Sequence, residues 1–418
     1  MPKPSLLHAS PFPPQESGIS DYSVALTLAL SEHFDITLYS DPSPISDPRL
    51  ARFPVVRHGV DEIQFDRYEH RLYQIGNQPW FHGYIYEACL MHPGLVVLHE
   101  PVLYYLTVGI YRDRPDFYSR LFRIGGPVAV SIIKRQLKEG RDLLQFREPH
   151  TLPLNRELLE SGNDIMVHSE RSGREVTDAA GPGLRVHKIN HLLISPSFIP
   201  TRSRQEVFGE LGIPPDATVI ASFGHVAPTK LNHVVCRVVR RLNEARPDGV
   251  YYLIVGPGNY IDPYLGKYVK MTGYISIDQF EEYLECCDLV VNLRYPSMGE
   301  TSGALIRAMQ AGKPCIVTDI GWFSELPDDA VLKLDVDRGD GLIERQLYEA
   351  LDIFMDHPEP FVRMAEVGAE YARTQHAPAR VAAEIYGALC GSRKTLFTSP
   401  LRAAVAREQA ERVASGTD

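Results

Sequence analysis

A lysine and a histidine lie five residues apart in the loop Gly224–Lys230 (GHVAPTK). The loop follows an apolar run, Thr218–Phe223, that is typical of a buried strand. At the carboxyl end of a strand and the start of a helix, Lys230 can neutralise a diphosphate leaving group without a metal ion, and His225 can donate to the same oxygens. The alternative is a solvated lysine, although the positive end of a helix dipole disfavours a cation there. The pattern favours an anion-binding loop.

A glutamate ahead of a predicted helix is the second candidate. Glu300 lies in the segment Gly299–Gly303 (GETSG), after the strand-like run Leu289–Leu293, and Thr301 or Ser302 can cap the helix that follows. Its carboxylate can accept two hydrogen bonds from vicinal sugar hydroxyls, and the helix amides can hold an anion. Taken alone, the segment is explained as well by ordinary compensation of the helix dipole.

A glycine in the loop Pro11–Asp21 is the third candidate. Gly18 lets backbone amides approach a ligand, and the predicted helix Ile19–Leu30 points its positive end at the same place. We expect Ser20 or Asp21 to cap this helix. A phosphate site and a plain strand-to-helix turn fit the loop equally well.

A histidine at the end of an apolar strand is the fourth candidate. His99 ends the run Leu95–Glu100, a position that points toward the ligand side of a parallel sheet. A histidine with a purely structural role fits the position equally well.

The elements that position these residues alternate between strands and helices along the chain. The first strand–helix–strand unit is predicted at Ser5–Ser10, Ile19–Leu30 and Asp35–Ser40, which implies a parallel sheet. Further strands are predicted at Asp164–His168, Tyr251–Val255 and Cys315–Thr318, and helices at Lys230–Ala245, Ile277–Cys286, Gly303–Ala311 and Gly341–Met355. Such a pattern predicts two open parallel sheets with a cleft between them, and ligands at the carboxyl ends of the strands.

Irregular segments divide the chain. The boundary between the two domains is predicted in Leu193–Ser203, which Pro196 and Pro200 interrupt. We expect domains at residues 1–198 and 204–377, with a helix at about 378–392 completing the first and a frayed tail at 393–418. The arginine- and lysine-rich stretch Thr107–Arg147 is interpreted as a helical insertion in the first domain.

Composition excludes several classes of protein. The 418 residues carry a net charge of −10, which argues against a general nucleic-acid binder. The six cysteines form no CxxC pair and show no zinc spacing, so we expect core packing in a reducing compartment and no metal site. We find neither a signal peptide nor an apolar run long enough to span a membrane, and predict a cytoplasmic protein. The basic stretch leaves peripheral attachment to the inner face of the membrane open.

Together these loops resemble the retaining GT-B glycosyltransferases, specifically glycosyltransferase family 4, from Pro11 to about Leu389. GHVAPTK looks like the family's diphosphate motif, with Lys230 in the lysine position, and LIVGPGN is similar to its strand ending in a glycine turn. MTGYIS resembles the loop against the nucleotide base, where Tyr274 and Ile275 would contribute backbone contacts. GETSGALIRAMQAGKPCIVTDIGWFSELPDD is similar to the block that carries the family's two glutamates.

Two positions depart from the family pattern. Glu300 matches the first glutamate, but Arg307 falls where the second, which binds the donor ribose, would lie. His225 stands where the family usually has arginine. Charge on the diphosphate would then rest mainly on Lys230, helped by His225 and Arg307.

The resemblance implies a GT-B fold, with two Rossmann-like domains facing a cleft, and a retaining, metal-independent glycosyl transfer. The substrate would be a nucleotide-diphosphate sugar, with no other cofactor, and the acceptor a glycan, a lipid-linked or a small molecule. Glu300, Lys230 and His99 would act on the donor sugar and its leaving group. The donor would be bound by Gly18, Gly224, His225, Tyr274, Ile275, Thr301, Ser302, Gly303 and Arg307. A non-catalytic GT-B partner subunit and a sugar-nucleotide epimerase are the alternatives, and neither the donor base nor the oligomeric state follows from the sequence.

Overall fold

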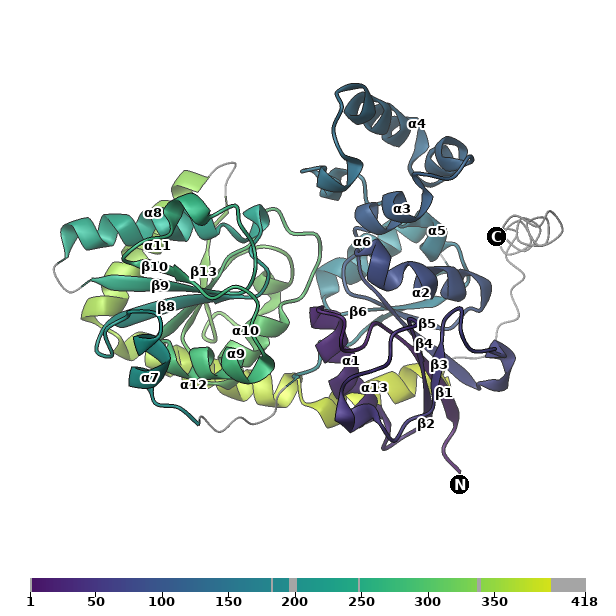
Figure 1. Ribbon diagram of the computed structural model, residues 1–418, viewed down its shortest axis with the longest axis horizontal. Helices are drawn as coiled ribbons and strands as arrows, with labels where there is room; N and C mark the ends of the chain where they lie inside the picture. Colours follow the sequence, from purple (N-terminus) through teal and green to yellow (C-terminus); the bar gives the residue numbers. More distant parts are fainter. Residues whose placement is uncertain (1, 182, 195–200, 247–248, 337–339, 392–418) are drawn as a thin grey trace. The chain divides into compact units, whose positions relative to one another are not determined.

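The computed structural model describes residues 2–181, 183–194, 201–246, 249–336 and 340–391 (Figure 1). The described chain forms two compact units. The first contains the residues up to Leu192, the short segment Met298–Thr301 and the last helix from Pro378. The second contains Leu193–Ser297 and Ser302–Ala377. The predicted tail 393–418 and part of the predicted boundary Leu193–Ser203 lie outside the described residues.

The first unit is built on a parallel sheet, which has seven strands among the residues described, in the order β3-β2-β1-β4-β5-β6-β7. The strands are β1 (Ser5–Ala9), β2 (Asp35–Ser40), β3 (Val55–Arg57), β4 (His70–Ile75), β5 (Leu95–Leu98), β6 (Asp164–Val167) and β7 (Val186–Lys188). The order reverses between β1 and β4, which makes this pair the point where an open parallel sheet binds ligands beyond its carboxyl edge.

Helices cover both faces of this sheet, because its strands are apolar on both sides. They are α1 (Gly18–Leu30), α2 (Pro79–Met91), α3 (Tyr104–Tyr111), α4 (Phe117–Lys138), α5 (Arg156–Leu159), α6 (Glu170–Ala180) and α13 (Pro378–Gly391), with 3-10 turns at Pro48–Leu50, Phe65–Arg67, Leu143–Gln145 and Pro149–Thr151. The last helix, α13, packs on α1, and its Tyr386 ring lies against the rings of His33 and Phe34. The stretch predicted as an insertion corresponds to α3 and α4, in the connection between β5 and β6.

The second unit repeats the design. Its parallel sheet has the order β10-β9-β8-β11-β12-β13 among the described strands, and here the reversal lies between β8 and β11. The strands are β8 (Thr218–Phe223), β9 (Val250–Val255), β10 (Val269–Met271), β11 (Leu289–Asn292), β12 (Cys315–Thr318) and β13 (Leu332–Leu334). The helices are α7 (Arg204–Gly209), α8 (Asn232–Ala245), α9 (Ile277–Cys286), α10 (Gly303–Gln310), α11 (Asp340–Asp356) and α12 (Glu359–Gln375), with 3-10 turns at Pro228–Lys230, Asp262–Tyr264 and Gly321–Glu325.

The first helix begins earlier than the sequence predicts. Ser17, rather than Ser20 or Asp21, is the N-cap of α1, and its side chain accepts a hydrogen bond from the Ile19 amide at 3.2 Å. The prediction was wrong because the helix already begins at Gly18, so Ser20 and Asp21 lie inside its first turn and cannot be the N-cap. The helix predicted from Lys230 likewise begins at Asn232, because Leu231 has a left-handed backbone (φ 53°) and separates a 3-10 turn from α8.

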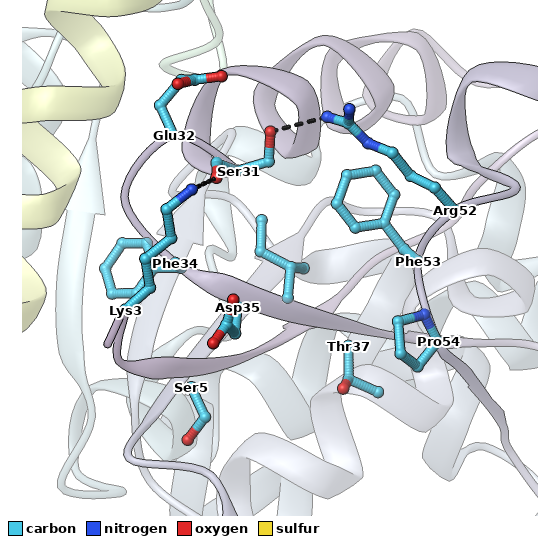
Figure 2. Close-up of a pocket in the computed structure, with 11 residues that line it drawn as sticks. Lys3, Ser5, Ser31, Glu32, Phe34, Asp35, Thr37, Arg52, Phe53 and Pro54 are labelled. Atoms are coloured by element: carbon cyan, nitrogen blue, oxygen red, sulfur yellow. Dashed lines mark hydrogen bonds between the residues drawn. The ribbon is translucent and has the colours of Figure 1, made fainter. Parts of the chain in front are cut away.

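A surface pocket opens at the other end of the first sheet, near the amino ends of β1 and β2 (Figure 2). Lys3 and Arg52 line it, and both donate to Ser31: Lys3 Nζ to the carbonyl at 2.7 Å and Arg52 to the hydroxyl at 3.0 Å. The pocket therefore lies at the edge opposite to the one where parallel sheets bind ligands.

Candidate functional site

The ammonium group of Lys230 lies at the carboxyl end of β8. It donates to the Phe223 carbonyl, the last of the strand, at 3.1 Å. Lys230 also lies over Gly224, where an added Cβ would come within 2.8 Å of Nζ. Because Gly224 has a φ of 92°, the loop needs glycine here both for its backbone and for the lysine. The partly buried cation is thereby held at the switch point of the second sheet, that is, between β8 and β11, where the strand order reverses.

A second glycine locks the Lys230 loop onto its neighbour. Gly256, after β9, has a φ of 143°, and a Cβ there would lie 2.4 Å from the Gly224 carbonyl oxygen. His225 is exposed beside this contact, and its pKa is lowered by partial burial and by the charge of Lys230. A lowered pKa makes the imidazole neutral at neutral pH, so His225 would donate to a diphosphate as a neutral group.

The loop after β11 lies beside the Lys230 loop. The Tyr295 amide donates to the Thr229 carbonyl at 2.8 Å, which joins the loops that leave the two strands at the switch point. Ser302 caps α10, accepting from the Leu305 amide at 3.2 Å, and the buried Asn292 amide donates to the same hydroxyl at 3.0 Å. The amino end of α10, with Gly303 in its first turn, is thus fixed to the end of β11.

Glu300 lies in the short segment that belongs to the first unit. Its Oε2 accepts from the Met298 amide at 2.7 Å, and the carboxylate is partly buried. The preceding Gly299 has a φ of 85°, and its carbonyl accepts from Ser172 Oγ at 2.8 Å. A Cβ on Gly299 would lie 2.5 Å from Pro101, so this glycine is required where the GETSG segment packs. Thr301 follows with its hydroxyl buried and without a hydrogen-bond partner among the described residues.

Two predicted donor contacts follow β10. Tyr274 is 61% exposed and Ile275 packs on the core of the second unit. They come directly after Gly273, whose φ is 76° and which bridges to Gly256. The backbone of this turn is therefore bonded to the loop after β9. A backbone contact with a planar nucleotide base, as predicted here, requires such rigidity.

Arg307, which stands where the family has its second glutamate, is buried in α10. Its guanidinium lies 3.6 Å from Glu281 and 5.0 Å from the centre of the Phe280 ring, both on α9. Phe280 in turn lies 4.8 Å from the ring of Phe223, which ends β8. The arginine thus packs within the second unit close to the Lys230 loop, and its predicted help to the diphosphate stays a prediction.

In the first unit, Gly18 and His99 lie at the carboxyl edge of the sheet. Gly18 opens α1, and a Cβ there would meet no atom within 4 Å, so packing does not require a glycine at this position. His99 follows β5, and its amide donates to the Ile75 carbonyl at 3.0 Å. Its ring packs edge-on against the buried ring of Tyr22, with centres 5.0 Å apart.

His99 belongs to an aromatic cluster whose other members were not predicted from the sequence. The rings of His168 and His191 lie 5.3 and 6.4 Å from it, and Nε2 of His99 is 2.9 Å from Gln74 Oε1. Burial, with the neighbouring histidines, holds the pKa of His99 well below its usual value. The signal that could have found the cluster is repetition, because His99 and His168 each directly follow a buried apolar strand.

Each unit thus gathers its own share of the predicted residues. Lys230, His225 and the amino end of α10 border the switch point of the second unit, while Gly18, His99 and the segment with Glu300 belong to the first. No group of three or more histidine, cysteine or acidic side chains in the described part of the chain could hold a metal ion.

Comparisons with known proteins agree with this geometry. Residues 217–352 match the family model described as glycosyl transferases group 1. No curated protein matches the sequence. Among solved structures, sucrose-phosphate synthase from Thermosynechococcus elongatus is similar at 14% identity with a TM-score of 0.62, covering 94% of this chain and 100% of that one.

Two further structures cover 93% of this chain and 100% of their own. HepE from Anabaena, in complex with UDP-glucose, has a TM-score of 0.58 at 14% identity. WaaG, a glycosyltransferase involved in lipopolysaccharide biosynthesis, has a TM-score of 0.57 at 13% identity. These likenesses confirm the predicted fold of two parallel-sheet α/β domains.

Proposed function

Since residues 217–352 match the model of the glycosyl transferases group 1 family in a chain with the GT-B fold, we propose that this protein transfers a sugar from a nucleotide-diphosphate sugar to an acceptor hydroxyl, with retention and without a metal ion. The family match bears out the predicted recognition as a group 1 glycosyltransferase and the predicted class of enzyme, while membership of glycosyltransferase family 4 stays a prediction. The choice of donor, retention and metal independence belong to the proposal.

The observation that carries the proposal is the cation at the switch point of the second sheet. Lys230 is held there by the Phe223 carbonyl, and its loop is bonded through Thr229 to Tyr295 in the loop that leads to α10. A lysine and a helix amino end both stabilise a departing diphosphate, whose negative charge grows as the sugar–oxygen bond breaks. Tyr274 and Ile275 would contact the base through their backbone, and HepE, bound to UDP-glucose in its crystal, supports a nucleotide sugar as the ligand.

The first unit has its own candidate groups for the sugar. Glu300 would accept hydrogen bonds from two sugar hydroxyls, and His99 would contact a third. In the transfer, the bond from the anomeric carbon to the diphosphate oxygen breaks and a bond to the acceptor oxygen forms on the same face. The acceptor proton leaves with the diphosphate, so the step needs no further reactant. Exclusion of water would protect the donor from hydrolysis.

Release of nucleotide diphosphate tests this proposal. The purified full chain is incubated with UDP-, GDP- and ADP-sugars, with chelator present, and the free diphosphate is measured. We expect slow release from one donor class, lost in Lys230→Met and in Glu300→Gln. Release that needs an added divalent cation would contradict metal independence. No release from any donor, together with no thermal shift by any nucleotide sugar, would contradict the enzyme. A changed sugar in recovered donor would indicate an epimerase.

We further propose that the acceptor is an anionic or lipid-linked glycan reached at a membrane surface, because the two arms of α4, which is kinked at Gly126 (φ 69°), expose basic and apolar side chains. Among the residues described, no helix is long and apolar enough to cross a membrane. The sequence of α4 contains no acidic residue. Tyr118, Phe122, Val128 and Leu137 are 42%, 58%, 63% and 44% exposed on it.

The basic groups of α4 divide into two sets. Arg120 and Arg123 bind the buried Glu157, at 2.7 and 3.0 Å, and Arg120 also binds Asp116 at 3.1 Å, so two carboxylates compensate their charge. Lys134, Arg135 and Lys138 are exposed in the last turns, and in Figure 1 the helix lies beyond α3, away from the sheet. Exposed aromatic rings beside uncompensated cations fit the boundary between anionic headgroups and acyl chains.

Sedimentation with vesicles tests this surface. We expect the full chain to bind vesicles that contain phosphatidylglycerol and not pure phosphatidylcholine, and Phe122→Ser or Lys134→Glu to weaken binding. Ile353→Ser is the control, because Ile353 is exposed to a similar degree, at 53%, but lies on α11, whose sequence is rich in acidic residues. Equal binding by Phe122→Ser and the control would refute the membrane contact.

A further inference from the structure

A chain of hydrogen bonds crosses the first sheet at its switch point and ends on His99. Thr27 Oγ1 lies 2.9 Å from His8 Nδ1, and His8 Nε2 lies 3.1 Å from Gln74 Nε2. Gln74 Oε1 then lies 2.9 Å from His99 Nε2. The chain runs from helix α1 through β1 and β4 to the end of β5, and Thr27, His8 and Gln74 are all fully buried.

The direction of every bond in this chain is set by one carbonyl group. The Thr27 hydroxyl donates to the Ser23 carbonyl at 2.7 Å, since a carbonyl oxygen can only accept. Thr27 must then accept from the Nδ1–H of His8, which leaves His8 Nε2 with a lone pair. That lone pair accepts from the Gln74 amide nitrogen, and the Gln74 oxygen accepts from the Nε2–H of His99. Nδ1 of His99 is therefore the unprotonated nitrogen.

This direction holds only if both imidazoles are neutral, because a cation would donate from both nitrogens. Burial lowers the pKa of His8 to about 3. The pKa of His99 also lies well below its usual value, through burial and the neighbouring His168, His191 and His82. Both rings are neutral at neutral pH, so each has one protonated nitrogen, and the chain selects which.

We propose that Gln74 is a positioning residue that fixes His99 as the Nε2–H tautomer, so that Nδ1 is offered as a hydrogen-bond acceptor to a hydroxyl group of the bound sugar. The sugar contact rests on the function proposed above, but the tautomer does not. In the described part of the chain Nδ1 of His99 makes no hydrogen bond, and the residue is only partly buried at the carboxyl edge. His99 can therefore select a sugar that presents, next to Nδ1, a hydroxyl group able to donate a hydrogen bond.

The packing around His99 holds the ring in one orientation. Tyr22 of α1 lies edge-on to it, with an angle of 88° between the planes, and His168 lies 5.3 Å away. Rotation of the Gln74 amide group by about half a turn is unfavourable, because its oxygen would then face the lone pair of His8 and its NH₂ group the proton of His99. The position of the proton on His99 is thus fixed by residues that never touch the sugar.

Nuclear magnetic resonance tests the tautomer without reference to activity. The full chain is labelled with ¹⁵N-histidine, and long-range ¹H–¹⁵N correlation distinguishes protonated from bare ring nitrogens, with the His99 signals assigned by their loss in His99→Gln. We expect Nε2 protonated and Nδ1 bare at neutral pH. A wild-type spectrum with Nδ1 protonated would overturn the proposal, whatever the variants do.

Two variants test the chain itself. Thr27→Val removes the acceptor of His8 and Gln74→Met removes the link to His99, so we expect a mixture of His99 tautomers in each. Thr107→Val is the matched control: Thr107 is a buried threonine of the same unit whose hydroxyl donates to the Leu154 carbonyl at 3.0 Å, outside the chain. An unchanged His99 spectrum in both folded variants would refute the role of Gln74.

Kinetics separates this inference from the proposed function. With the donor that the release assay identifies, Gln74→Met is expected to lower kcat/KM about two- to tenfold, the value of one neutral hydrogen bond. The His99 spectrum as expected with no turnover of any donor would leave the tautomer standing and refute the function. Full kcat/KM in Gln74→Met, with a clear loss in His99→Ala, would refute the positioning role alone.

Discussion

Removing the charge of Lys230 should slow release of the diphosphate more than any other single change in the second unit. Nζ is held 3.1 Å from the Phe223 carbonyl at the carboxyl end of β8. A unit charge developing about 4 Å from it, at an effective dielectric constant near 20, is stabilised by about 4 kcal/mol. Since the ground-state donor already gains part of this, we expect Lys230→Met to lose about 3 kcal/mol, or roughly 10²-fold in kcat.

A second variant displaces the same lysine without removing its charge. In Gly224→Ala the new Cβ would lie 2.8 Å from Nζ, at a backbone φ of 92°. We expect a smaller loss of kcat, about tenfold, with a loss of about 1–3 kcal/mol in the free energy of unfolding from the strained backbone. Urea unfolding and diphosphate release, measured on the same preparations, separate the two effects.

Lys313 provides the matched control. Its Nζ also donates to a backbone carbonyl, that of Glu285, at 2.7 Å, but it precedes β12 at the amino edge of the sheet. Lys313→Met should leave kcat within about twofold of wild type, since the long-range charge of a distant lysine is screened. An equal loss in both methionine variants, or no loss in Lys230→Met, would refute the reasoning.

Three further predictions concern stability. Ser17→Ala removes the N-cap of α1 and should lower the free energy of unfolding, measured in urea, by about 1 kcal/mol. A loss of stability in Ser20→Ala and none in Ser17→Ala would show instead that Ser20 is the N-cap, as predicted from the sequence. Arg307→Met leaves the buried Glu281 carboxylate without its arginine and should lower the free energy of unfolding by about 3–5 kcal/mol. Most of this loss should be recovered when Glu281 is also replaced by methionine, and purely additive effects in the double variant would contradict the pairing. Burial lowers the pKa of His82 to about 4, so its contribution to stability is lost as pH falls from 6.5 toward 4. Between these pH values, His82→Phe should reduce the fall in the free energy of unfolding by about 1.4 kcal/mol per pH unit, and an unchanged slope would contradict the prediction.

The apolar strands of the fold could be predicted from sequence because their burial is local in the chain. β2, β8 and β12 have the predicted bounds, and the Lys230 and Glu300 loops were found because each directly follows such a strand. β4 was missed because His70, Arg71 and Gln74 interrupt its apolar residues. Its polar members are buried by partners that the sequence does not bring near.

Gln74 shows why part of the site could not be predicted. Its two side-chain contacts are with His8 and His99, 66 and 25 residues away along the chain. Arg307 is similar, since its position was noted as a departure but its partner Glu281 lies on another helix. Residues that act through tertiary contacts leave no spacing pattern, whereas loops at strand ends do.

Binding of a nucleotide sugar is the central claim, and a thermal-shift panel tests it most directly. UDP-, GDP- and ADP-sugars are each titrated against the full chain and against Lys230→Met. A ligand at about 100 times its Kd stabilises the folded state by about 2.7 kcal/mol. We predict that one nucleotide class raises the Tm of the wild type by about 5–10 °C, with saturation, and that Lys230→Met loses most of the shift. No shift with any nucleotide sugar, or an equal shift in Lys230→Met, would contradict the account.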